Sequence, residues 1–197
     1  MTLPVNESDP EIAQAFIQNA RMFLTEEYLP KIERCLEKLT DEQIWWRANP
    51  ESNSIGNLIL HLSGNANQWI VCGLGNESDN RTRQAEFDQR GGVSKDELLS
   101  LLLGTVAKVD ATLDRFEPRK LLAEYSIQGT TTTALAAIFH VTEHFSMHTG
   151  QIILQAKMLA GLDLKFYDFA NGKPEHTWHR SASSTPHSTS SSSGNQS

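Results

Sequence analysis

Apolar residues recur at spacings of three and four along most of this 197-residue chain, and almost nothing alternates with a period of two. This periodicity is typical of amphipathic α-helices, each of which must bury its apolar stripe against a neighbour. The pattern predicts long helices over residues 9–39, 54–74, 94–117 and 132–159. Pro30 lies inside the first of them and should interrupt or kink it. Four such helices without a convincing sheet predict an all-α fold, a four-helix bundle.

Several residues have the chemistry that begins a helix. Asp9 is a suitable N-cap, and the residue after it is a proline, which the first turn tolerates. Thr40 with Gln43, and Ser94 with Glu97, have the spacing of a capping box, in which each side chain satisfies a backbone N–H of the other residue. These signals predict helix starts after residues 9, 40 and 94.

The segments outside the long helices are polar. Residues 76–92 are charged and end in Gly-Gly, so we expect a long loop there. Residues 119–129 are expected to be a connector, with a short extended piece at 125–127. The predicted helical domain spans residues 1–175. The Ser/Thr-rich stretch 176–197 has too little apolar surface to offset the entropy cost of ordering, which predicts a disordered tail.

Composition and charge narrow the range of partners and locations. The formal net charge is −7 and no cluster of Lys or Arg stands out, which argues against nucleic-acid binding, because that requires a basic face. No apolar run approaches the roughly 20 residues that cross a bilayer, and the polar N-terminus does not have the pattern of a secretory signal. Cys35 and Cys72 lie within helical patterns, which favours buried thiols in a reducing compartment. We therefore expect a cytoplasmic protein that binds neither nucleic acid nor membrane.

The histidines are the residues that indicate a functional site. His140, His144 and His148 follow one another at a spacing of four, so they form a stripe along one face of the last predicted helix. The stretch from His140 to His148 covers about two turns and spans about 12 Å, too far for one ion to be reached by all three histidines. An adjacent pair is therefore the better candidate for metal binding, as in other helical zinc sites. His61, on the second predicted helix, is the candidate for a further ligand.

A structural role is the alternative for each of these histidines. A single histidine at the edge of a bundle is more often a hydrogen-bonded structural residue than a ligand. The sequence does not say whether the helices that carry His61 and the histidine stripe face each other at the same level. From spacing alone, both interpretations therefore stand.

At these residues the sequence resembles the DinB/YfiT-like superfamily of metal-binding four-helix bundles. Members carry one ligand histidine on the second helix and a His-x-x-x-His pair, followed by Gly-Gln, on the last long helix. His61 matches the first ligand, and His144 with His148 matches the pair, with Gly150 and Gln151 after it. The resemblance thus implies a divalent metal site at His61, His144 and His148, and selects this pair over the preceding one.

The resemblance extends to an uncharacterised branch of that superfamily. The stretches 45–50, 54–61 and 143–148 look like that branch, and the similarity covers about residues 10–160. Two positions depart from the pattern, because many relatives have a second histidine and an arginine where this chain has Met147 and Thr149. These departures could change the substrate or the surroundings of the ligands.

The resemblance also implies a range of functions. Characterised relatives include transferases and isomerases that use low-molecular-weight thiols, and others have been described as metal-dependent hydrolases. It therefore implies one divalent ion, Zn or Ni, with a thiol as a further cofactor and a small molecule as substrate. A metal-binding or interaction module without catalysis is the third alternative, and no catalytic residue is assigned. A homodimer would be ordinary for such a bundle.

Five polar residues are candidates for supporting roles. His140 is expected to line the pocket rather than bind the ion. Asn57 and Gln151 could hydrogen-bond ligand imidazoles, because such partners fix the tautomer, although solvent-facing amides are the alternative. Arg81 and Arg83 could meet an anionic thiol or a substrate carboxylate, whereas the simpler expectation is a pair of solvated loop charges.

Overall fold

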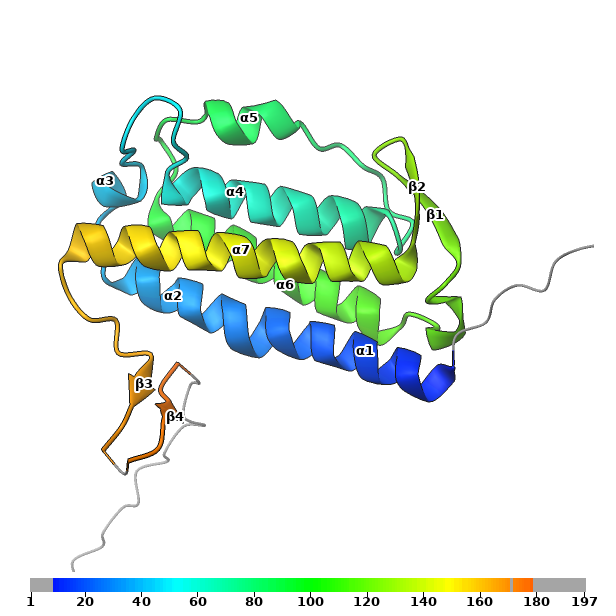
Figure 1. The fold of residues 1–197 in the computed structure, drawn as a ribbon. Helices are drawn as coiled ribbons and strands as arrows, with labels where there is room; N and C mark the ends of the chain where they lie inside the picture. Colours follow the sequence, from blue (N-terminus) through cyan, green and yellow to red (C-terminus); the bar gives the residue numbers. More distant parts are fainter. Residues whose placement is uncertain (1–8, 171, 179–197) are drawn as a thin grey trace, which may run out of the picture.

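Four helical rods lie side by side and form the body of the protein (Figure 1). The structure is a computed structural model, which describes residues 9–170 and 172–178. The rods are α1–η1–α2 (Pro10–Met22, Phe23–Tyr28 and Leu29–Glu37), α4–η2 (Ile55–Ala66 and Asn67–Cys72), α6 (Lys95–Asp114) and α7 (Ala134–Ala160). The predicted all-α four-helix bundle is confirmed.

The first rod shows how the chain accommodates a proline inside a helix. Asp9 caps α1 as predicted, and its side chain accepts hydrogen bonds from two backbone N–H groups of the first turn. Pro30 lies in the first turn of α2 and cannot donate the hydrogen bond that an α-helix requires there. The preceding segment η1 is π-helical, and the N–H of Leu29 bonds to the carbonyl of Leu24, five residues back. The interruption is therefore local, and the helical rod continues through it.

The core follows from the three-and-four spacing of apolar residues. Every rod turns this stripe inward, where the side chains pack into one continuous cluster. Its largest fully buried members include Ile17, Leu24, Ile32, Leu58, Leu62, Leu102 and Phe145. Burial of this apolar surface is the main force that holds the rods together.

Short elements connect the rods, and two of them differ from the prediction. The capping box at Thr40 is present and begins the short helix α3 (Asp41–Ile44). Inside the predicted loop 76–92 lies a short helix, α5 (Arg83–Asp88), which runs over α4 (Figure 1). None of its residues is buried, so it has no apolar stripe that a sequence pattern could reveal.

A β-hairpin replaces the single extended piece expected before the last helix. It consists of β1 (Glu124–Ile127) and β2 (Thr130–Thr133), paired antiparallel after the turn η3 (Pro118–Lys120). Gln128 and Gly129 both have positive φ, as a two-residue hairpin turn requires. The hairpin leads directly into α7, which Thr133 caps.

A second small hairpin lies beyond α7. Its strands are β3 (Tyr167–Asp168) and β4 (Glu175–His176). Trp178 follows it and is buried, with the ammonium group of Lys31 4.0 Å from its ring. The predicted domain boundary at residue 175 stays a prediction, and residues 179–197 of the predicted tail lie outside the described residues.

Both cysteines are free thiols; Cys35 is buried as expected, whereas Cys72 is only half-buried. Burial raises the pKa of the Cys35 thiol to about 12, which keeps it protonated at neutral pH. Among the described residues, the helices fall short of the length and apolar character that a membrane crossing needs.

The position of α7 in the core predicts a large difference between two of its phenylalanines. Phe145 is completely buried, whereas Phe139 is 59% exposed. Phe145→Ala should lower the free energy of unfolding by about 3–5 kcal/mol, because it leaves a cavity in the core. Phe139→Ala on the same helix should change it by no more than about 0.5 kcal/mol. Urea unfolding followed by circular dichroism measures both values, and similar losses would show that α7 does not pack as described.

Candidate metal centre

His61, His144 and His148 converge between α4 and α7. One ring nitrogen of each lies within 4.8 Å of the others. The Nε2 atoms of His61 and His144 are 2.9 Å apart. The ring of His148 is 4.4 Å from that of His144 and 5.3 Å from that of His61, centre to centre. The structure thus brings together the three residues that the sequence singled out, and their nitrogens could hold a metal ion.

The local sequence explains this convergence. Ser54 forms a capping box with Asn57, which fixes the start of α4 and hence the direction in which His61 points. His144 and His148 are one turn apart on α7, so both rings lie on the same side of that helix. Because α4 and α7 pack along each other, that side meets the ring of His61.

The hydrogen bonds of His148 suit a metal ligand. Its Nδ1 is 2.7 Å from Oε1 of Gln151, and because an amide oxygen only accepts, the proton lies on Nδ1. The Nε2 atom then carries a lone pair. It is buried and has no hydrogen-bond partner among the described residues. Gln151 therefore has the contact that the sequence suggested, and an unpartnered buried nitrogen faces the other two imidazoles, as an ion would require.

His61 is held by a residue that sequence reasoning did not select. Its Nδ1 lies 2.9 Å from Oε2 of Glu86, which comes from α5. Arg81 donates to both oxygens of that carboxylate, at 2.7 and 2.9 Å. Burial acts to raise the pKa of the Glu86 carboxyl, but the hydrogen bonds from Arg81 and His61 outweigh it and hold that pKa below its ordinary value. Nη2 of Arg81 also lies 3.1 Å from Nδ1 of His61, but the carboxylate oxygen is nearer and carries charge. An ionised carboxylate only accepts, so it favours the proton of His61 on Nδ1, which leaves the lone pair on Nε2, the atom that faces His144.

His140 lies beside the three histidines rather than among them. Nδ2 of Asn65 is 3.2 Å from its Nε2, and the ring of Trp69 is 4.4 Å away. Its own ring is 5.3 Å from that of His144. This placement agrees with the expectation that His140 lines the site.

Asn57 has a different role from the suggested one. Its side-chain amide donates to the backbone carbonyls of Glu86 and Gln89, at 2.7 and 3.0 Å, rather than to an imidazole. Its Oδ1 accepts hydrogen bonds from the cap residue Ser54 and from Arg47. Asn57 is thus fully occupied in joining α4 to the α5 segment, which the sequence alone did not reveal.

The two loop arginines differ in their exposure to solvent. The side chain of Arg81 is only 4% exposed, and besides Glu86 it donates to Oε1 of Gln68 at 2.8 Å. Arg83 lies over the ring of Phe87, 4.8 Å from its centre, and Phe87 in turn packs against the His61 ring. Arg81 therefore covers His61 directly, whereas Arg83 is exposed, as expected of a loop charge, and lies near that ring only through Phe87.

The environment keeps the imidazoles of His144, His148 and His140 neutral. Burial, reinforced by the charges of the neighbouring histidines and Arg81, lowers the pKa of His144 to about 3. Burial also lowers the pKa of His148 and of His140 below the ordinary value. Neutral imidazole is the form that binds metals, so the lone pairs are available at neutral pH.

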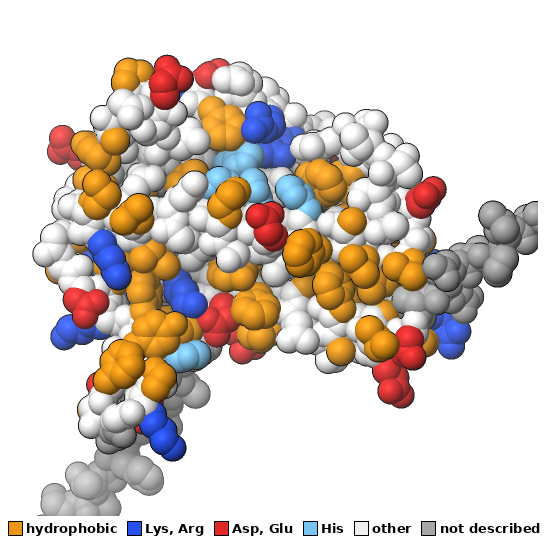
Figure 2. Space-filling model, viewed as in Figure 1, with side chains coloured by type: hydrophobic (Ala, Val, Ile, Leu, Met, Phe, Trp, Pro, Cys, Tyr) orange, Lys and Arg blue, Asp and Glu red, His pale blue; other side chains and the backbone are white. Residues whose placement is uncertain are grey.

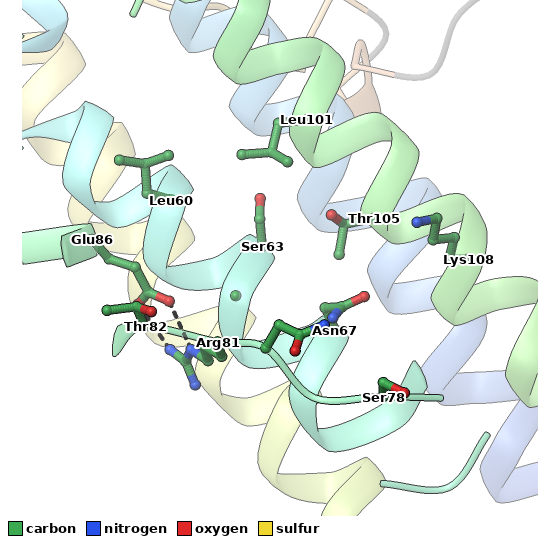
Figure 3. A pocket seen from close by; sticks show the side chains of 12 residues that line it. Leu60, Ser63, Asn67, Ser78, Arg81, Thr82, Glu86, Leu101, Thr105 and Lys108 are labelled. Atoms are coloured by element: carbon green, nitrogen blue, oxygen red, sulfur yellow. Dashed lines mark hydrogen bonds and ion pairs between the residues drawn. The ribbon is translucent and has the colours of Figure 1, made fainter. Parts of the chain in front are cut away.

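The cluster has access to solvent, and a cavity lies next to it. In Figure 2 histidine side chains reach the surface in the middle of the face shown, with hydrophobic and basic side chains above them. A cavity of about 420 Å³ lies between α4, α6 and the loop before α5 (Figure 3). Arg81 and Glu86, which contact His61, also line this cavity, together with Ser63, Asn67, Thr105 and Lys108. The Arg81–Glu86 pair is therefore shared between the cavity and the histidines.

Comparison with known sequences gives one family. Residues 11–173 match the family described as "Protein of unknown function (DUF1572)". The chain belongs to this family. A comparison with curated proteins finds no significant match for this DUF1572 member.

Solved structures with the same fold include proteins from two bacteria. A conserved protein from Enterococcus faecalis is 15% identical, covers 77% of this chain and 97% of its own, and has a TM-score of 0.57. A DinB-like protein from Bacillus cereus is 17% identical, covers 70% of this chain and 88% of its own, and has a TM-score of 0.55. The DUF1572 chain therefore has an all-α, DinB-like fold, as the resemblance implied, and at these identities the likeness concerns the fold alone.

The lowered pKa of His144 predicts a pH dependence of stability in the metal-free protein. In the unfolded chain this imidazole takes up a proton near pH 6.5, whereas in the folded chain it does so only near pH 3. Between these values only the unfolded state binds the proton, so the free energy of unfolding should fall steadily as the pH drops below 6.5. His144→Gln should flatten this slope. Urea titrations in the presence of a chelator at several pH values measure it, and equal slopes for both proteins would contradict the assignment.

Proposed function

We propose that this DUF1572 protein binds one divalent metal ion through His61, His144 and His148, with Zn²⁺ or Ni²⁺ as the resident ion. The observation that carries the proposal is the convergence of three imidazoles, one of which has a buried nitrogen without a partner in the described part of the chain. The acceptors at Nδ1 of His61 and His148 support it, because each leaves Nε2 unprotonated. Zn²⁺ and Ni²⁺ are among the ions that imidazole ligands suit.

Three protein ligands favour a reactive rather than a purely structural ion. Structural zinc sites have four protein ligands, whereas catalytic sites have three and keep a position for water or substrate. A bound ion in such a site supplies positive charge that favours the deprotonated form of a thiol or of water. The solvent access of the histidines is consistent with this use.

Of the two reactions, we propose transfer of a low-molecular-weight thiol to a small electrophile. Hydrolysis benefits from a carboxylate that can take a proton from water, but the carboxylate that contacts this cluster, Glu86, already accepts from Arg81 and His61. Thiol transfer needs less, because a thiol is far more acidic than water and can release its proton to solvent. The sulfur then forms a bond to the electrophilic carbon, and the leaving group departs with the electron pair of the broken bond.

Metal content tests the first part of the proposal. The purified untagged protein, reconstituted with Zn²⁺ or Ni²⁺ and desalted, should retain about one ion per chain, because three neutral imidazoles converge on one point. His144→Ala/His148→Ala should retain none, as measured by elemental mass spectrometry.

His140→Ala discriminates between the histidines of the stripe. It should keep the wild-type stoichiometry, because His140 is held by Asn65 and Trp69 outside the cluster. An empty wild-type protein, or loss of the ion in His140→Ala, would contradict the proposed ligand set.

Turnover tests the second part. The metal-loaded protein should consume an electrophile such as 1-chloro-2,4-dinitrobenzene only when a low-molecular-weight thiol is present, with a rate at least about tenfold above that of the double histidine variant. The absorbance of the thioether product follows the reaction. Hydrolysis of ester or amide probes without any thiol would favour the hydrolase, and an absence of both activities would favour a binding module.

A further inference from the structure

The side chains of Arg81 and Glu86 form an ion pair that is largely shielded from solvent, and both contact the imidazole of His61. Glu86 uses one oxygen for Nε of Arg81 and the other for both Nη2 of Arg81 and Nδ1 of His61. Dashed lines in Figure 3 mark the bonds between the two charged side chains. The remaining amino group of Arg81 donates to Gln68 on the same rod as His61. Gln68 therefore holds Arg81, and the ring of His61 holds Glu86.

The helix beneath the pair is shaped to receive it. Gly64 lies in the interior of α4, where glycine is unfavourable compared with alanine. A Cβ atom at this position would lie 2.1 Å from Oε1 of Glu86 and 2.9 Å from Nε of Arg81. The absence of a side chain at Gly64 is therefore what allows the ion pair to lie against the helix.

The backbone that carries Glu86 is anchored as well. Asn57 donates to the carbonyl of Glu86 itself and to that of Gln89. Arg47 donates to the carbonyl of Phe87 at 3.1 Å. Both Asn57 and Arg47 lie at or before the start of α4. Their hydrogen bonds hold the backbone of α5, and so fix the position of the Glu86 carboxylate relative to His61.

We propose that the Arg81–Glu86 pair, seated on Gly64, is a positioning device that keeps the proton of His61 on Nδ1 and so presents an unprotonated Nε2 to the metal ion. The inference rests on the proposed metal function and deepens it. Two features make the pair suited to this task. The carboxylate can only accept, and its oxygen is nearer to Nδ1 of His61 than Nη2 of Arg81 is, at 2.9 against 3.1 Å, so it favours a proton on that nitrogen. Arg81 fills the remaining acceptor positions, which fixes the carboxylate in this orientation.

Glu86→Gln should reverse the proton preference with almost no change in shape. Its amide has only one oxygen, and the shorter of the two bonds from Arg81, the 2.7 Å bond from Nε, should hold that oxygen in the place of Oε1. The NH₂ group would then face Nδ1 of His61 and favour the tautomer protonated on Nε2. That proton occupies the nitrogen required by the metal, so we expect Zn²⁺ affinity to fall by about 10- to 100-fold.

The experiment has a readout that does not depend on metal. Long-range ¹H–¹⁵N spectra of the metal-free protein distinguish the two imidazole tautomers, and His61 should change from the Nδ1–H to the Nε2–H form in Glu86→Gln. Competition with a chromophoric chelator gives the Zn²⁺ affinity. Asp88→Asn is the matched control, because it removes the same charge from the same short helix, where Asp88 is exposed and bonded to Gln84. It should match the wild-type protein in tautomer and in affinity.

Gly64→Ala tests the same inference without touching a charged group. The added methyl should displace Glu86 and weaken Zn²⁺ binding by a similar factor. Gly104→Ala, in the interior of α6 with open space around it, should leave affinity unchanged. The inference is overturned if Glu86→Gln keeps the Nδ1–H tautomer of His61, or if both Glu86→Gln and Gly64→Ala bind Zn²⁺ as tightly as the wild-type protein. A wild-type protein that binds no metal while His61 still changes tautomer would instead overturn the proposed function and leave the positioning role intact.

Discussion

The contact between α4 and α7 is the constraint on which the rest of the site depends. It brings polar imidazoles into a helix interface that is largely apolar, and burying a polar group is unfavourable unless it has a partner, as His140 has in Asn65. The outer nitrogens of His61 and His148 have such partners, whereas the inner nitrogen of His148 does not. An ion at the centre would remove this remaining cost, so metal binding and the stability of the interface are coupled.

Much of the fold could be predicted, because its signals are local. The capping boxes at Thr40 and Ser94 begin helices where expected, and the apolar periodicity outlines the four rods. The elements that were missed have no such signal. Helix α5 buries none of its residues, and the β1–β2 hairpin depends on a Gln128–Gly129 turn with positive φ rather than on a run of β-formers. Short elements of this kind are fixed by their tertiary contacts rather than by their own sequence.

The candidate site could be predicted only in part, for a similar reason. The histidine spacing indicates a shared face of α7, but the choice of His144 with His148 came from a family resemblance. Glu86 is distant in sequence from every histidine, and its contact depends on a glycine in the facing helix that makes room for it. Asn57 was predicted to hydrogen-bond an imidazole or to face solvent, whereas it is buried and donates to the backbone of the α5 segment.

The three imidazoles are therefore not equivalent. Gln151 lies less than one turn from His148 on the same helix, so that contact forms whenever α7 forms. His61, in contrast, depends on a segment that is separate from the bundle and held to it by Asn57, Arg47 and Arg81. A carboxylate alone in this place would be a buried unpaired charge, which costs several kcal/mol, so Glu86 and Arg81 are only tolerable together. Because the same pair also lines the neighbouring cavity, whatever enters that cavity meets the residues that hold His61. A substitution in the segment over α4, or a ligand bound in the cavity, would thus change the hydrogen bonds of His61 and with them the binding of the ion.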